Sequence, residues 1–169
     1  MPEAGRQQGV SWPLEEELAD DTLNFSNAVI PVLESVELTR NQNFTLSGAP
    51  GETVTLNLQN FILTGHSTFT LEGSATTTFI INITNQFSLS QKACIVLSGG
   101  VTCYNVFFNV LGPGSPLVLK GQSYLPGTLT AIQRKVRMRG QAVVYGWVIS
   151  SKTRIRQQAQ IIDPPVVSP

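Results

Sequence analysis

The stretch Leu117–Ser150 decides the fold, because it contains one short pattern twice, nineteen residues apart. The segment LVLKGQ at 117–122 returns as VRMRGQ at 136–141, and GTLTA at 127–131 returns as GWVIS at 146–150. Each copy consists of an alternating strand, a glycine corner, a few further residues, a second glycine corner and another apolar strand. A unit this short cannot bury its own apolar face, so its copies must stack on one another.

Residues before this repeat show the same alternation with a period of two. They are rich in Val, Ile, Phe and Thr and are punctuated by Gly, Asn and Ser, which is typical of strands. We expect strands at Val36–Thr39, Asn43–Leu46, Thr53–Leu58, Phe61–Leu63, Thr68–Leu71, Thr77–Ile83, Phe87–Leu89, Cys94–Leu97 and Tyr104–Leu111. A β-sandwich would need hairpin turns, yet neither Asn-Gly nor Asp-Gly occurs in the chain. The sequence therefore predicts an all-β fold, a β-solenoid (β-helix) of about six coils.

The 169 residues are enough for one domain with a substantial core. We expect a disordered lead-in at 1–12, a single solenoid domain at 13–162 and a tail at 163–169. The segment PLEEELADDTL at 13–23 is the best helix candidate, with Pro13 in its first turn and three glutamates near its amino end. Such a helix, packed along the side of the solenoid, would protect open strand edges.

Composition points to a protein that works outside the cell. Charged residues make up only 13 %, and the remaining polar surface is rich in hydroxyl and amide groups. There is no apolar run long enough for a membrane span, and the first eleven residues lack the apolar core of a secretory signal. We expect an extracellular or cell-surface location. Cys94 and Cys103 either form a disulfide across neighbouring strands or are both small buried hydrophobes.

The sequence contains few of the carboxylate and histidine side chains that catalysis commonly uses. No Asp or Glu lies between Glu72 and Asp163, so the strand region lacks the carboxylates that a hydrolase or lyase would need. His66 is the only histidine, which argues against a metal site or a catalytic triad. We therefore expect no enzymatic activity, no metal and no cofactor.

Basic residues near the carboxyl end form the sharpest local feature. Lys135, Arg137 and Arg139 share one parity of a strand, and the pattern returns seventeen residues later as Lys152, Arg154 and Arg156. On adjacent coils these like charges would lie about 5 Å apart, which destabilises a sheet unless a counter-charge is present. One interpretation places that counter-charge in the acidic residues of segment 15–21 or in a neighbouring chain. The other predicts an anionic partner, such as a surface glycan or another anionic polymer. The sequence argues against a nucleic-acid partner, because aromatic residues are sparse near the two basic triplets and the net charge is zero.

Three phrases carry a family resemblance: FIINI at 79–83, IVLSGGVTCYNVFFNV at 95–110, and the doubled unit at 117–150. Together they resemble the adhesive β-solenoid domain of bacterial choice-of-anchor A surface proteins. They are also similar to the DUF3494-type ice-binding domain, a solenoid with a helix along its side. The resemblance spans about Val36 to Ile162 and implies an adhesion or ligand-binding module. It supplies no catalytic residues.

Threonine-rich strands offer a second candidate face. Thr53 and Thr55 share one parity, as do Thr68 and Thr70, and rows of hydroxyl groups on a flat solenoid face can order water. Ice binding is therefore an alternative function, although Thr on an outer strand face usually reflects β propensity. The third candidate function is structural: the solenoid would self-associate as the subunit of a surface fibre.

Overall fold

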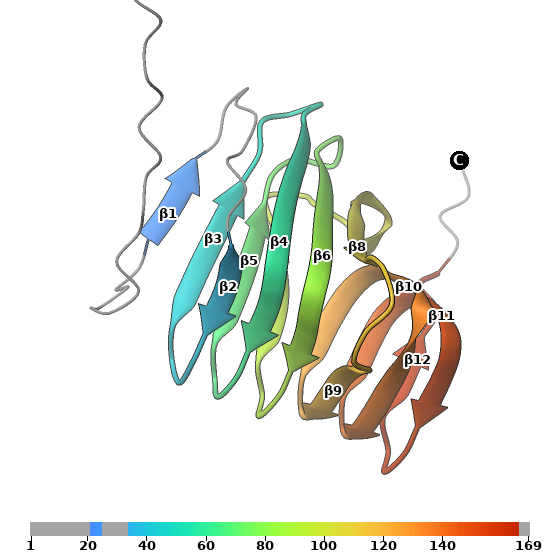
Figure 1. The fold of residues 1–169 in the computed structure, drawn as a ribbon. Helices are drawn as coiled ribbons and strands as arrows, with labels where there is room; N and C mark the ends of the chain where they lie inside the picture. The colour runs from blue at the N-terminus through green and yellow to red at the C-terminus, as the bar shows by residue number, and fades with distance from the viewer. Residues whose placement is uncertain (1–20, 25–33, 166–169) are drawn as a thin grey trace, which may run out of the picture.

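A computed structural model describes residues 21–24 and 34–165 of the chain. These residues form a parallel solenoid, whose strands follow one another from β1 at one end to β12 at the other (Figure 1). The elements are β1 (Asp21–Asn24), β2 (Ser35–Leu38), β3 (Asn43–Ser47), β4 (Thr53–Leu63), β5 (Thr68–Glu72), β6 (Thr78–Leu89), β7 (Cys94–Ser98), the 3-10 helix η1 (Cys103–Asn105), β8 (Val106–Val110), β9 (Leu117–Gly121), β10 (Tyr124–Gly140), β11 (Val143–Ile155) and β12 (Gln160–Ile162). The predicted all-β solenoid is confirmed.

Each coil passes through three faces of the solenoid. Face 1 contains β1, β3, β5, β7, the first residues of β10 and β11, and β12. Face 2 contains the first halves of β4 and β6, then β8 and the middle of β10 and β11. Face 3 begins with β2 and continues through the second halves of β4 and β6, β9, and the last parts of β10 and β11. Strands β4 and β6 turn the corner between faces 2 and 3 without interruption, where the sequence predicted two separate strands each.

The strand register confirms the nineteen-residue repeat. Leu119 of β9 pairs with Met138 of β10, and Gly127 of β10 pairs with Gly146 of β11. Other coils differ in length, since hydrogen-bonded side chains on neighbouring coils are 25 residues apart near the amino end and 17 apart near the carboxyl end. Within residues 34–165, face 2 holds five stacked strands, so five coils are complete there and partial coils lie at both ends.

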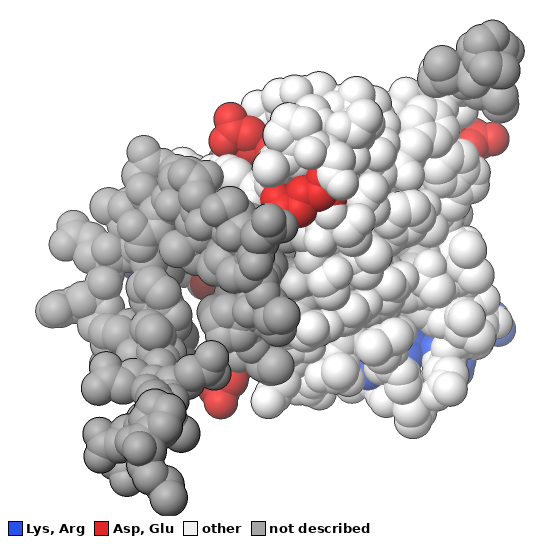
Figure 2. All heavy atoms as spheres, turned by 90° about the horizontal axis from the view of Figure 1, so that it is seen from above, with Lys and Arg blue, Asp and Glu red and all other residues white. Residues whose placement is uncertain are grey.

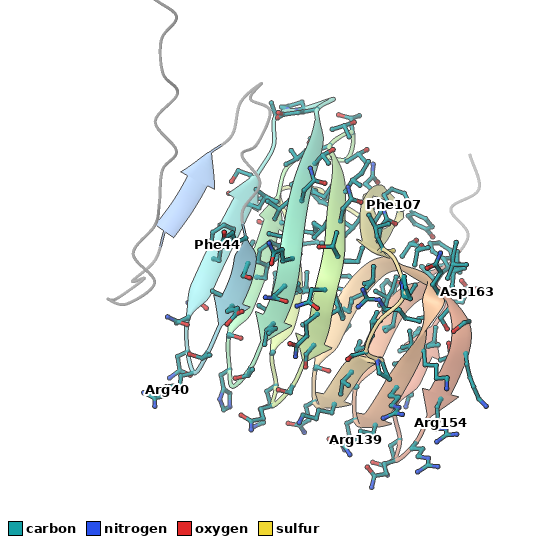
Figure 3. All side chains as sticks on the ribbon, viewed as in Figure 1. Arg40, Phe44, Phe107, Arg139, Arg154 and Asp163 are labelled. Atoms are coloured by element: carbon teal, nitrogen blue, oxygen red, sulfur yellow. The ribbon has the colours of Figure 1, made fainter. Side chains whose placement is uncertain are left out.

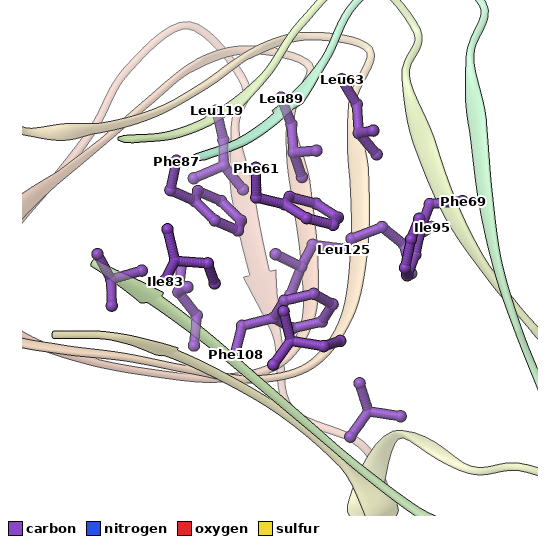
Figure 4. Packing of buried hydrophobic residues seen from close by; sticks show 14 of the residues in the cluster. Phe61, Leu63, Phe69, Ile83, Phe87, Leu89, Ile95, Phe108, Leu119 and Leu125 are labelled. Carbon is purple, nitrogen blue, oxygen red and sulfur yellow. The ribbon is translucent and has the colours of Figure 1, made fainter. Parts of the chain in front are cut away.

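The inward side chains of all three faces form one apolar core (Figure 4). Phe61 lies at its centre in the amino-terminal half, with ring centroids 5.1 Å from Phe69, 5.6 Å from Phe87 and 5.7 Å from Phe108. In the carboxyl-terminal coils the buried residues are smaller: Leu125, Leu129, Ala131, Val136, Met138, Ala142 and Val144. Burial of these alternating residues on every strand holds the coils in register.

Two stacked glycines form the corner between faces 1 and 2 in the doubled unit. Gly127 and Gly146 both have positive φ angles, +120° and +148°. A Cβ atom on Gly146 would lie 2.0 Å from the carbonyl oxygen of Gly127, so the corner closes only without side chains. In the earlier coils the same corner is a loop, at residues 48–52, 73–77 and 99–105.

Two further expectations concern the amino end and the cysteines. The predicted helix at 13–23 lies mostly outside the described residues. It is wrong for Asp21–Leu23, which belong to β1, because parallel pairing with β3 gives this segment a strand conformation. Cys94 is half-buried on face 1, Cys103 is buried in η1, and both are free thiols. The alternative of a disulfide between them is therefore not seen.

Candidate ligand-binding face

Strand pairing on face 3 brings the two predicted basic triplets together. Lys135 pairs with Lys152, and Arg137 pairs with Arg154. The backbone N–H of Arg156 donates to the carbonyl of Met138, which places Arg156 on the strand position next to Arg139. The expected stacking of like charges on adjacent coils is confirmed, at the spacing of about 4.8 Å that separates neighbouring strands.

A seventh cation extends this arrangement to a third coil. Lys120 of β9 pairs with Arg139 of β10. We refer to the whole set as the basic surface; it consists of Lys120, Lys135, Arg137, Arg139, Lys152, Arg154 and Arg156. Lys120 is half-buried and the other six side chains are exposed. Inward neighbours Val136 and Met138 are fully buried, so the strand alternation fixes the cations on the outside.

The basic surface has no counter-charge among residues 34–165, since none of its side chains makes a hydrogen bond or an ion pair there. Arg139 and Arg154 project from the ends of β10 and β11 (Figure 3). Seen from above, the visible blue side chains gather on one side of the carboxyl-terminal end, and red side chains lie on its opposite side and toward the amino-terminal end (Figure 2). Glu37, on the same face, lies at the other end on β2. Of the acidic residues in segment 15–21, predicted to supply a counter-charge, Asp21 belongs to β1 on face 1, and the others lie outside the described residues.

A buried arginine fixes the corner that leads into the basic surface. Arg134 is 3 % exposed, and its guanidinium donates to four backbone carbonyls, those of Thr84 (2.7 Å), Asn85, Leu111 (2.9 Å) and Gly112 (2.9 Å). These charge-assisted bonds offset the cost of burying the charge. Sequence reasoning missed this role, because Arg134 precedes the exposed triplet directly and looks like part of it.

The threonines predicted as one hydroxyl face lie on two faces. Thr53 and Thr55 are on face 2, where Thr53 pairs with Thr78. Thr68 and Thr70 are on face 1, beside Asn43 and Thr45. The prediction of a single face made of these four residues is therefore wrong. A corner loop separates the two strands of each coil, and the spacing of Thr residues in the sequence does not show which face a strand joins.

Face 2 carries a row of asparagines that the sequence analysis did not predict. The amide of Asn82 donates to the side-chain oxygen of Asn57 (2.9 Å), and that of Asn109 donates to Asn82 (3.0 Å). A matching row of glutamines runs between faces 3 and 1, with Gln122 donating to Gln141 at 2.8 Å. Both rows could have been predicted from the sequence, because the same amide residue recurs at the coil spacing of 19 to 27 residues.

Face 1 has a shallow, mainly apolar groove near its carboxyl-terminal end, with a volume of about 460 Å³. Val96, Pro126 and Tyr145 from successive coils line it, together with Cys103 and Tyr124. Burial, followed by the neighbouring Tyr145 and Cys103, raises the pKa of Tyr124, and burial also raises the pKa of Cys103. Both groups are therefore neutral at physiological pH, and the groove adds no charge near the basic surface.

Comparison with known proteins identifies the family of this chain. The family model described as Ice-binding-like matches residues 38–162. The chain belongs to the ice-binding-like family. The matched segment covers all coils from the end of β2 to β12, and it agrees with the resemblance expected over Val36 to Ile162. No curated protein and no solved structure matches the chain.

Among residues 34–165 of this domain, face 3 is the face on which charged side chains stack over adjacent coils. No helix in the part of the chain that the structure describes is long and apolar enough to cross a membrane. Among the same residues, no cluster of three or more His, Cys, Asp or Glu side chains could hold a metal ion.

Proposed function

We propose that this ice-binding-like domain is a non-enzymatic, extracellular adhesion or binding module that contacts an anionic polymer, such as a surface glycan, through the basic surface. The observation that carries the proposal is the stacking of seven cations over three adjacent coils, with no acidic side chain bound to them in residues 34–165. Like charges opposite one another oppose folding, so an external anion is the natural counter-charge.

Protection of an open strand edge is the simplest alternative explanation of the cations. Lysine and arginine on an edge strand discourage pairing with other chains. That role needs charge only on β11, whose residues 147–155 have no partner on one side among the described strands. Here the cations continue inward to Arg137 and Arg139 on β10 and to Lys120 on β9. Edge protection does not explain these inner coils, whereas a bound polymer does.

A glycan array at low and high salt tests the proposal. We expect binding to sulfated, phosphorylated or uronate-containing glycans at low salt, weakening as salt screens the charges, and no binding to neutral glycans. The double variant Arg137→Glu with Arg154→Glu should lose this binding by at least about 100-fold, because both members of the central pair are reversed in charge.

The matched control is Arg40→Glu with Lys92→Glu. It changes the net charge by the same amount at two exposed corners outside the basic surface, Arg40 near the amino-terminal end and Lys92 on the coil next to Lys120. Its binding should stay within about threefold of the parent. Equal losses in the two double variants would show that only net charge matters, and unchanged binding in the Arg137 and Arg154 variant would defeat the proposal.

Ice binding is the second candidate, favoured by the family and by the neutral rows of face 2. Hydrogen bonds between Asn57, Asn82 and Asn109 hold these amides in fixed positions, and Thr53 and Thr78 form a further pair beside them. Ordered hydroxyl and amide groups at the strand spacing can hold ordered water. This row lies on face 2 and the basic surface on face 3, so the two functions are compatible in one domain.

Thermal hysteresis and inhibition of ice recrystallisation decide this candidate. Asn82→Lys should abolish either activity, because it breaks the centre of the row on face 2. Thr70→Lys on face 1 is the matched control and should leave it unchanged. Absence of both activities in the parent protein at high concentration would remove ice binding from consideration.

A further inference from the structure

The basic surface is ordered as pairs of cations, and the pairs repeat along the strand direction. Adjacent coils supply the two members of each pair: Lys135 with Lys152, Arg137 with Arg154, and Arg139 with Arg156. Members of one pair are separated by the distance between neighbouring strands, about 4.8 Å. Successive pairs are two residues apart on the same strand, which is about 6.7 Å. The surface is therefore a row of three equivalent positions for an anion.

The spacing between the pairs selects among linear polyanions. Equivalent atoms of residues i and i+2 are joined by six backbone bonds, which in an extended chain span about 7 Å. The phosphorus atoms of two phosphodiester groups joined by a three-carbon linker are also six bonds apart. An extended phosphodiester chain of this kind can run parallel to β10 and β11 with one phosphate at each pair. Condensed polyphosphate, whose phosphorus atoms are only two bonds apart, would place several charges at one pair.

The chemistry of each position also fits a phosphodiester. Such a group carries one negative charge on two free oxygens, and these can accept from one cation on each side. Four of the six paired residues are arginines, whose planar guanidinium groups suit oxyanions. The neighbouring strand β9 offers no aromatic ring on which a nucleobase could stack beside Arg137. Its outward residue at that position is Val118.

From this geometry we infer that the ligand of the basic surface is a base-free phosphodiester polymer with three-carbon linkers, bound parallel to the strands through three consecutive phosphates. This inference rests on the proposed function and specifies its ligand class. Since three phosphates are neutralised, the logarithm of the affinity should fall with the logarithm of salt concentration with a slope of about −2.

Synthetic oligomers with a defined linker test the spacing. The probes are chains of three phosphodiesters joined by three-carbon or by nine-carbon linkers, which carry equal charge, and binding is measured by calorimetry on the full chain. The three-carbon oligomer should bind at least about tenfold more tightly, because only its phosphates reach all three pairs together. Affinity should rise from one to three phosphates and then level off.

A variant that lacks one of the three cation pairs tests the number of phosphate positions. Arg139→Gln with Arg156→Gln removes one pair and should abolish the advantage of three phosphates over two. Arg40→Gln with Lys92→Gln should preserve that advantage. A thymidine oligomer with three phosphodiesters, binding more than tenfold tighter than the base-free one, would overturn the inference in favour of nucleic acid.

The remaining outcomes separate this inference from the proposed function. If the three-carbon and nine-carbon oligomers bind equally, and Arg137→Glu with Arg154→Glu abolishes both, the spacing is overturned while the proposed function stands. If neither oligomer binds and the glycan array is also blank, both are overturned.

Discussion

The amino-terminal and carboxyl-terminal coils differ in the side chains that fill their core and in the corner that joins faces 1 and 2. In the first, coils of about 25 residues enclose a cluster of phenylalanines, and a loop turns the corner between faces 1 and 2. In the second, coils of 19 and 17 residues enclose leucine, valine, methionine and alanine, and single glycines turn that corner. Fewer residues per coil leave a smaller interior, so side-chain size follows coil length.

The outer surfaces differ more than the interiors. The long coils carry neutral Thr and Asn on face 2, while the short coils carry the basic surface on face 3 except for Lys120, which lies on the adjoining long coil. Because alternation is preserved in both regions, outward positions can change from amide to cation without altering the core. The comparison therefore assigns stability to the inward residues and ligand choice to the outward ones. Substitutions in each class can test this division.

Removal of the central phenylalanine should have the largest effect. Phe61→Ala leaves a cavity among three other rings and should lower the free energy of unfolding by about 4 kcal/mol. Urea unfolding followed by circular dichroism measures the change. Phe61→Leu, which keeps most of the volume, should cost about 1 kcal/mol. A loss below about 2 kcal/mol for the alanine variant would mean that the long coils collapse around the cavity.

The glycine corner of the short coils should come next. Gly146→Ala places a methyl group against the carbonyl of Gly127 at a positive φ angle and should cost about 3 kcal/mol. Gly112→Ala is the control, because Gly112 also has a positive φ (+69°) but no atom lies within 4 Å of the added carbon. It should cost only about 1 kcal/mol, the price of the backbone conformation alone. Equal losses would show that the corner is not closely packed.

Replacement of the buried arginine should have an intermediate effect. Arg134→Met keeps an extended side chain but leaves four backbone carbonyls without their donor, so the free energy of unfolding should fall by about 2 kcal/mol. Hydrogen exchange of loop 111–116 should accelerate as well. Arg134→Lys should recover less than half of the loss, because one ammonium group cannot reach all four carbonyls. Full recovery with lysine would indicate that charge alone is required.

The sequence predicts the architecture well because the core follows a local rule. Alternation of apolar residues and the return of Gly127 at Gly146 specify strands and coil length, and both are confirmed by the register. Pairing of Arg137 with Arg154 follows from the return of the basic triplet after seventeen residues, and a register shift after Ala131 accommodates the difference from nineteen. Assignment of Thr53 and Thr68 to faces depends instead on corner loops of variable length, which periodicity does not fix. The burial of Arg134 depends on Thr84 and Asn85 in the middle of β6 and on loop 111–116, which meet only in three dimensions.

The smallest predicted effect concerns the basic surface and has the opposite sign. Arg137→Gln removes a cation that faces Arg154 on the next coil, so it should raise the free energy of unfolding by about 0.5 kcal/mol at low ionic strength. In about 1 M salt, where the screening length falls to about 3 Å, the gain should disappear. Glu37→Gln on β2 is the control, because its neighbour on the next coil is Ile62, and it should show no such gain. A loss of stability at both salt concentrations would mean that packing of the arginine stem outweighs repulsion. A gain confined to low salt would show that the protein retains these charges at a cost to folding, as expected if their role is to bind an anion.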